Sequence, residues 1–118
     1  LSLLRKLLDP KRYITAQALR SLTDNCPARC AGIVTGRQRP GTASGVIFLT
    51  LEDETGLANV IVHPKLAESQ RRELLGSRLL GVLGVLQREG DVVHLIAKRL
   101  VDHSELLGRL STSSRDFR

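Results

Sequence analysis

Apolar and polar residues alternate through the middle of the chain, and this pattern predicts β-strands rather than helices. Ile47, Leu49 and Leu51 form one continuous apolar set, so their side chains should point inward and those of Phe48 and Thr50 outward. Similar segments recur on both sides, separated by turn-forming residues. The expected strands are Ala28 to about Arg39, Val46 to Asp53, Leu57 to His63, Leu79 to Gln87 and Val92 to Leu100.

Helical spacing is confined to two regions outside these strands. Pro64 suits the first turn of a helix, apolar residues then recur at helical spacing, and Gly76 is a plausible C-terminal stop. Near the start of the chain, Leu1 to Leu8 reads as the end of a short helix. Thr15 is a candidate cap for a second helix over Ala16 to Leu22.

The order of elements is therefore three strands, a helix and two strands. This order predicts an all-β fold with minor α content, a five-stranded Greek-key barrel of the OB type with short N-terminal helices. An open α+β sheet is the competing arrangement. Closure is favoured because a barrel needs strongly curved strands, and glycines interrupt the first and fourth strands at Gly32, Gly36, Gly81 and Gly84. The expected domains are a helical linker segment over 1–25, the barrel over 26–103 and a tail over 104–118.

The net charge of the chain suggests what kind of partner the domain binds. The 118 residues suit one domain, and 18 Lys and Arg against 12 Asp and Glu give a net charge of +6. Such a balance suggests a polyanionic partner, although it is also what a soluble surface can carry. Only 3% of residues are aromatic, which leaves few platforms for base stacking.

No apolar run is long enough to span a bilayer, and a start at Leu1 without Met looks like an excised fragment.

No group of residues has the spacing of a metal or catalytic site, so no cofactor is expected in this chain. Cys26 and Cys30 stand without further ligands at zinc spacing and are interpreted as reduced cysteines of a cytosolic protein. The acidic run 52–54 invites a magnesium interpretation, but consecutive residues on a strand point in alternating directions. Asp53 is better explained as the cap of the turn at Thr55-Gly56.

One long block of the sequence is also familiar. It resembles the OB domain of bacterial error-prone DNA polymerases, the mutagenic relatives of the replicative polymerase III alpha subunit. The resemblance covers nearly the whole chain, and its most specific part is the run Arg-Gln-Arg-Pro-Gly-Thr-Ala at 37–43. The matching segments are 32–46, 48–56, 84–90, 93–97 and 114–117.

The resemblance implies a large cytoplasmic bacterial enzyme that adds nucleotides across damaged templates during the SOS response. Its polymerase carboxylates, and the magnesium expected with them, would lie in a palm domain that is not in this chain. The implied partners are single-stranded DNA, other domains of the same polymerase and SOS accessory proteins, with no membrane. The family usually has Trp where this chain has His63, and the change removes a potential stacking surface.

Strand parity then selects candidate binding residues, because OB barrels bind nucleic acid on the face of strands two and three and the flanking loops. The candidates are Arg37, Arg39, Phe48, Thr50, Asn59, His63 and Arg88. Phe48 is expected to stack on a base, or else to be covered by the N-terminal helices or by the rest of the polymerase. Arg37 and Arg39 are expected to pair with phosphates, and Arg88 is a weaker candidate for the same role. Lys98 is interpreted as general surface charge.

Three functions remain open at this point. The first is a module that binds the single-stranded template ahead of the polymerase active site. The second is a docking module, in which the barrel face or the tail from Ser111 to Arg118 contacts another polymerase domain or an accessory protein. The third, and least favoured, is the anticodon-binding OB domain of a tRNA synthetase.

Overall fold

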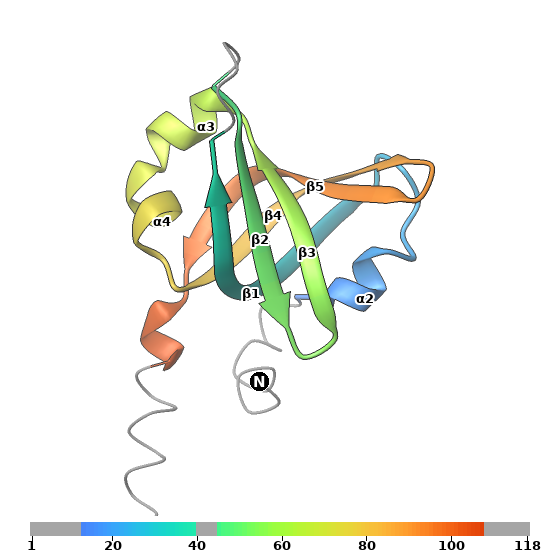
Figure 1. The fold of residues 1–118 in the computed structure, drawn as a ribbon, viewed down its shortest axis with the longest axis horizontal. Coiled ribbons are helices and arrows are strands. Elements are labelled where there is room, and N and C mark those ends of the chain that lie inside the picture. The colour runs from blue at the N-terminus through green and yellow to red at the C-terminus, as the bar shows by residue number, and fades with distance from the viewer. Residues whose placement is uncertain (1–12, 40–44, 108–118) are drawn as a thin grey trace, which may run out of the picture.

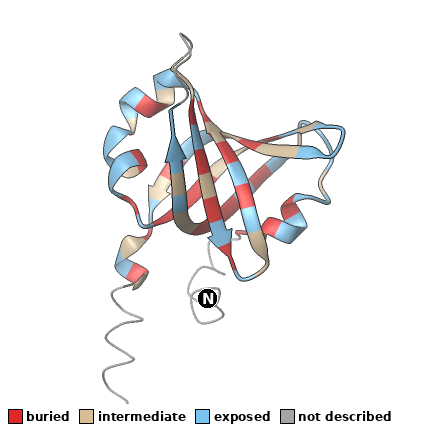
Figure 2. Cartoon of the chain, in the orientation of Figure 1, coloured by how far each residue is buried: buried red, intermediate tan, exposed pale blue. Residues whose placement is uncertain are grey.

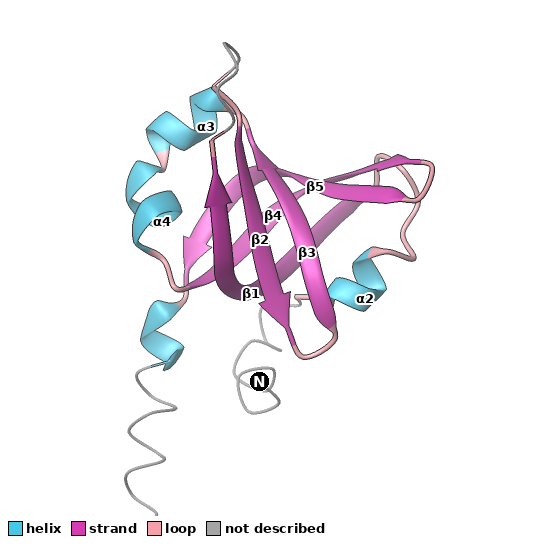
Figure 3. Ribbon diagram, in the orientation of Figure 1, coloured by secondary structure: helices cyan, strands magenta, loops and turns pink. Residues whose placement is uncertain are grey.

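A computed structural model describes residues 13–39 and 45–107. Five strands form a closed barrel in the order β1-β2-β3-β5-β4 (Figure 1), which confirms the predicted five-stranded OB barrel and excludes the open sheet. Short helices lie around it (Figure 3). The elements are α2 (Ala16–Leu19), β1 (Pro27–Gln38), β2 (Ile47–Asp53), β3 (Gly56–Val62), α3 (Pro64–Ser69), α4 (Arg71–Gly76), β4 (Leu79–Glu89) and β5 (Val92–Asp102).

The barrel closes because β1 is long enough to pair with two neighbours. Its first half pairs with β4 from Pro27 to Ile33, and its second half pairs with β2 as far as Gln38. The register of the β1–β2 pair shifts between Val34 and Gly36, where a bulge turns the strand. On the other side, β3 and β5 run parallel and complete the ring.

The barrel interior is filled by the alternating apolar residues of every strand. Ile47, Leu49 and Leu51 are 4%, 1% and 1% exposed, and Val60 and Val62 are fully buried, as their parity predicted. Figure 2 shows the resulting alternation of buried and exposed positions along β2 and β3. One face of each strand is therefore committed to the core, and only the outward face is available for binding.

Two strand glycines let neighbouring strands approach more closely than a side chain allows. A Cβ at Gly84 would overlap the carbonyl oxygen of Ile96, and one at Gly32 would lie 2.7 Å from that of Glu52. The register between β4 and β5 also shifts between Leu83 and Gly84. These positions explain in steric terms why glycines interrupt the first and fourth strands.

The helices differ from the prediction in two ways. The single helix expected between strands three and four is broken at Gln70, whose side-chain amide bonds the backbone of Leu100 as both donor (2.8 Å) and acceptor (2.7 Å). This anchor to β5 fixes the break between α3 and α4. The helix expected from Ala16 ends at Leu19 rather than Leu22. The helix expected over 1–8 lies outside the described residues.

Helix α2 packs against the barrel and is held there by Asp53. Ala16 and Leu19 of α2 are 1% and 2% exposed and belong to the barrel core. The backbone N–H of Ala16 donates to Asp53 Oδ2 at 2.7 Å. The other carboxylate oxygen accepts from the N–H groups of Thr55 (2.7 Å) and Gly56 (3.1 Å) and from the Thr55 hydroxyl. The predicted cap of the 55–56 turn is confirmed, and the same carboxylate also anchors α2.

Replacing Asp53 by Asn should destabilise the fold. The amide replaces one carboxylate oxygen by an NH2 group that faces N–H donors, so a buried set of charge-assisted hydrogen bonds is lost. We expect the free energy of unfolding in urea, followed by circular dichroism, to fall by about 2 kcal/mol. The matched control is Glu52→Gln, because Glu52 is the exposed neighbour on the same strand. Equal stability of the two variants would contradict the anchoring role of Asp53.

Candidate nucleic-acid interface

The outward faces of β2 and β3 form one continuous surface. Phe48 is 37% exposed and lies opposite Ile61 in the β2–β3 ladder, and Thr50 lies opposite Asn59. Asn59 is exposed and Thr50 is partly buried, so the outward placement predicted from strand parity is confirmed. The surface therefore offers one aromatic ring, one aliphatic neighbour and two polar side chains to a ligand.

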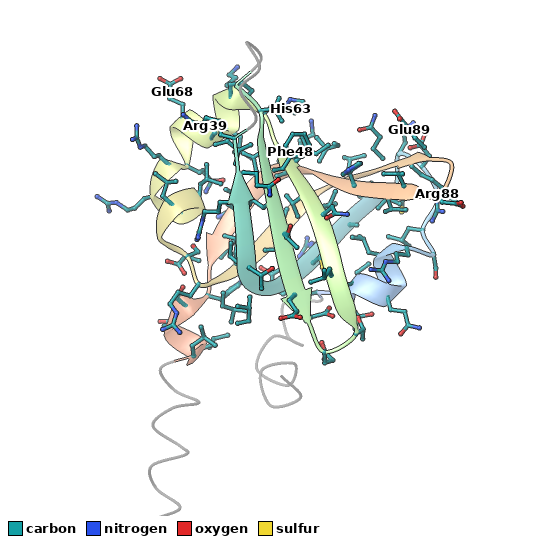
Figure 4. The ribbon with its side chains drawn as sticks, in the orientation of Figure 1. Arg39, Phe48, His63, Glu68, Arg88 and Glu89 are labelled. Atoms are coloured by element: carbon teal, nitrogen blue, oxygen red, sulfur yellow. The ribbon has the colours of Figure 1, made fainter. Side chains whose placement is uncertain are left out.

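Two further candidates stand at the same end of this surface. Arg39 follows the last residue of β1, and His63 follows the last residue of β3 as the N-cap of α3. Both are exposed. Figure 4 shows Arg39, Phe48 and His63 near this end of the barrel. A cation and an imidazole thus lie near the exposed aromatic ring.

Arg37 is placed differently from Arg39. Its Nε donates to the carbonyl oxygen of Leu74 at 2.8 Å, and a terminal nitrogen donates to that of Ser77. These carbonyls lie at the end of α4 and just after it, so the guanidinium joins β1 to that end of the helix. No pattern in the sequence indicates this contact, and phosphate binding by Arg37 stays a prediction.

Arg88 is likewise occupied by the protein. Its guanidinium donates to the carbonyl oxygen of Leu22 at 2.9 and 3.2 Å and also to that of Arg20. Its backbone N–H donates to Asp24 Oδ1 at 2.8 Å. Figure 4 shows Arg88 on the β4–β5 hairpin, well away from Phe48. Arg88 therefore connects this hairpin to the segment after α2, and its role as a phosphate contact is untested.

Lys98 lies closer to the candidate surface than its place in the sequence suggests. It lines one hollow together with His63, Ile96 and Gln87. Lys98 is exposed, and within the described ranges no hydrogen bond or ion pair engages it. The parallel β3–β5 pairing brings these residues together. Strand parity alone does not reveal which strands become neighbours, so the sequence offered no direct signal.

The outward face of β1 and β4 is partly covered by the chain itself. Tyr13, Leu79 and Leu106 pack there in a second apolar cluster. The Tyr13 hydroxyl shares a buried hydrogen bond of 2.8 Å with Nε2 of His103. Burial raises the pKa of Tyr13 above its usual value, against a smaller opposing effect of Arg29 and Arg99, so the hydroxyl stays protonated near neutral pH. This covering leaves the β2–β3 side as the open candidate face.

The described part of the chain contains no group of three or more His, Cys, Asp or Glu residues placed to hold a metal ion. Glu52 is exposed and Asp53 buried, so the acidic run does not converge on one point. Cys26 and Cys30 are not joined by a disulfide. None of the helices between residues 13 and 107 that the structure describes is long and apolar enough to cross a membrane.

Comparison with known proteins identifies the class of domain. Residues 28–102 match the tRNA anti-codon family model, described as an OB-fold nucleic acid binding domain. The chain belongs to this family of OB-fold nucleic acid binding domains. Asparaginyl-tRNA synthetase from Pyrococcus horikoshii has a similar fold, with a TM-score of 0.63 and 22% identity over 76% of this chain and 22% of that chain. An OBody bound to hen egg-white lysozyme has a TM-score of 0.63 and 16% identity over 80% of this chain and 93% of that chain.

The particular relatives are error-prone DNA polymerases, as the sequence resemblance indicated. The chain is 65% identical over 99% of its length to the error-prone DNA polymerase of Dechloromonas aromatica. It is 66% identical over 99% of its length to that of Azoarcus sp.. It spans 11% of the length of each of these relatives, so it corresponds to one small part of such a polymerase.

Arg37, which lies in β1, and Arg39, which follows the last residue of β1, should differ in their effect on stability. Arg37→Gln removes hydrogen bonds from a cation to the carbonyls of Leu74 and Ser77, so the free energy of unfolding should fall by about 1–2 kcal/mol. Arg39→Gln is the control, because its side chain is exposed and no described residue bonds it. Urea denaturation measures both variants. If Arg37→Gln left the free energy of unfolding unchanged, the contact with α4 would contribute little to stability.

Proposed function

We propose that this barrel binds the single-stranded template of an error-prone DNA polymerase that copies past DNA lesions. The observation that carries the proposal is the exposed Phe48 ring on the open β2–β3 face, with Arg39 and His63 near it. A base stacks on an aromatic ring whatever its sequence, and nearby cations pair with the backbone phosphates. Such a site suits a template whose sequence and damage vary.

The composition supports a weak and salt-dependent contact. With one exposed aromatic ring on the face, stacking contributes at few positions, and the net charge of +6 supplies much of the attraction. Sequence-independent binding of this kind has a Kd of about 10⁻⁴ to 10⁻⁶ M at physiological salt. The polymerase chemistry, with its magnesium, would belong to a part of the parent enzyme outside this chain. The barrel would guide the template strand.

A docking role is the second candidate, and a specific observation favours it. Leu57 and Val92 are 46% and 52% exposed and line a hollow between β3, α2 and the β4–β5 hairpin. Exposed apolar side chains grouped around a hollow are common at protein contacts. Under this proposal, the barrel or the tail over 111–118 contacts another domain of the polymerase or an SOS accessory protein.

The template proposal predicts a loss of affinity when Phe48 is shortened. A stacked base is worth about 1–3 kcal/mol, so Phe48→Ala should weaken binding to a labelled single-stranded oligonucleotide about fivefold or more. Arg39→Gln should weaken binding and lower the salt slope by about 0.7, the value for one lost phosphate contact on a single strand. Fluorescence anisotropy at low and physiological salt measures both effects.

The control for Phe48 is Leu75→Ala, because Leu75 is a 52% exposed apolar residue on α4 rather than on the β2–β3 face. A matched duplex tests the preference for single strands. Absence of binding to any oligonucleotide at low salt would overturn the template proposal. Loss of a polymerase-domain or accessory partner in a pull-down, after deletion of 111–118 and with DNA binding unchanged, would support docking instead.

A further inference from the structure

We infer that the α3–α4 pair carries a docking site for a short acidic segment of a partner protein, with one apolar side chain as its anchor. The site is a hollow of about 330 Å³, lined by residues of both helices and by Arg39 and Gly45 next to β1 and β2. We call it the helix-pair hollow. It is separate from the hollow that Leu57 and Val92 line, and docking there does not depend on template binding.

The floor of the helix-pair hollow is aliphatic. Ala67 of α3 and Leu74 of α4 line it and are 9% and 1% exposed. Leu75 also lines it but is 52% exposed. None of the described residues that line this hollow is aromatic, so it lacks the flat ring on which a base stacks. An exposed leucine beside an aliphatic floor, bordered by charged groups, instead suits an apolar side chain of a protein partner.

Positive charge predominates around this floor. Arg39 and Arg71 line the hollow and are exposed, and neither makes a hydrogen bond or ion pair with a described residue. Arg37 lies at the same hollow, because its Nε donates to the carbonyl oxygen of Leu74 at 2.8 Å. Glu68 is the acid among the lining residues, and Figure 4 shows it pointing away from the barrel. This excess of guanidinium groups favours a partner that carries carboxylates.

Contacts with the barrel hold the hollow in shape. Gln70, between the two helices, bonds the backbone of Leu100 in β5. Arg37 joins β1 to the end of α4. Figure 1 shows the two helices beside the barrel near the end of β1. Because these bonds fix both helices before a partner arrives, binding requires little further ordering of this surface.

The size of the hollow limits what it can hold. Its volume of about 330 Å³ lies near the lower end of the range of about 300–1,000 Å³ that ligand pockets occupy. It therefore suits a single anchor side chain with flanking carboxylates, rather than a broad apolar surface.

The test starts from short random peptides displayed on phage, selected against the immobilised 118-residue chain. We expect the enriched peptides to carry several Asp or Glu residues and at least one apolar residue. A labelled synthetic copy of the most enriched peptide is then titrated with the chain, and fluorescence anisotropy gives its Kd. Binding should weaken as salt rises, because exposed ion pairs are screened. A copy with amides in place of its carboxylates is the control peptide.

Two substitutions at the hollow should weaken binding of the selected peptide. Leu75→Ala should raise the Kd about fivefold, because the exposed half of this side chain is buried in the complex. Arg71→Gln should raise it about threefold through the loss of one exposed ion pair. Arg72→Gln is the charge-matched control, because Arg72 is the exposed neighbour on α4 that does not line the hollow. Leu57→Ala is the apolar control, since Leu57 is 46% exposed at the other hollow.

The outcomes separate this docking site from other binding. Weaker peptide binding by the Leu75 and Arg71 variants, with the Arg72 and Leu57 variants unchanged and all four folded in urea denaturation, supports the site. Failure to enrich acidic peptides, equal effects at Arg71 and Arg72, or a loss at Leu57 in place of Leu75 overturns it. Weaker oligonucleotide binding by the Leu75 and Arg71 variants, without enrichment of acidic peptides, assigns the hollow to nucleic acid and also overturns it. Phe48-dependent binding of a single strand is measured independently, so the template proposal stands or fails separately.

Discussion

The carboxylate of Asp53 is the constraint on which the candidate binding face depends. It accepts the N–H groups of Thr55 and Gly56 and so holds the tight turn between β2 and β3. Asp53 and Gly56 are the first pair of this ladder, and every later pair follows from them by counting away from the turn. The register that sets Phe48 opposite Ile61 is therefore fixed at this turn. The second oxygen of the Asp53 carboxylate holds α2 against the barrel core, so the turn and the core packing stabilise each other.

Sequence reasoning succeeded where a single periodicity decides the outcome. Alternation along β2 was enough to place Ile47, Leu49 and Leu51 inside and Phe48 outside, because a strand has only two faces. The order of strands and the glycines in β1 and β4 were enough to predict closure. The broken helix was missed because its cause is a contact between Gln70 and Leu100, 30 residues apart, that no local pattern records.

The same limit applies to the candidate site. Strand parity predicts the direction of a side chain, but it does not reveal which residues that side chain contacts. Arg37 and Arg39 share parity, yet the first bonds backbone carbonyls at the end of α4 and the second lies exposed beyond the end of β1. The sequence predicts only general surface charge at Lys98, because its neighbour in space, His63, is known only once β3 and β5 pair in parallel.

Hydrogen bonds within the protein also change how its net positive charge should be interpreted. Arg20, Arg37 and Arg88 each donate from the guanidinium to backbone carbonyls, so part of the positive charge secures the fold. A carbonyl does not neutralise a cation, and the long-range attraction for a polyanion persists. Close phosphate pairing, however, needs donors that are free to turn toward the ligand. The salt dependence of binding should therefore reflect a few exposed cations near the β2–β3 face, Arg39 among them, rather than the net charge of +6.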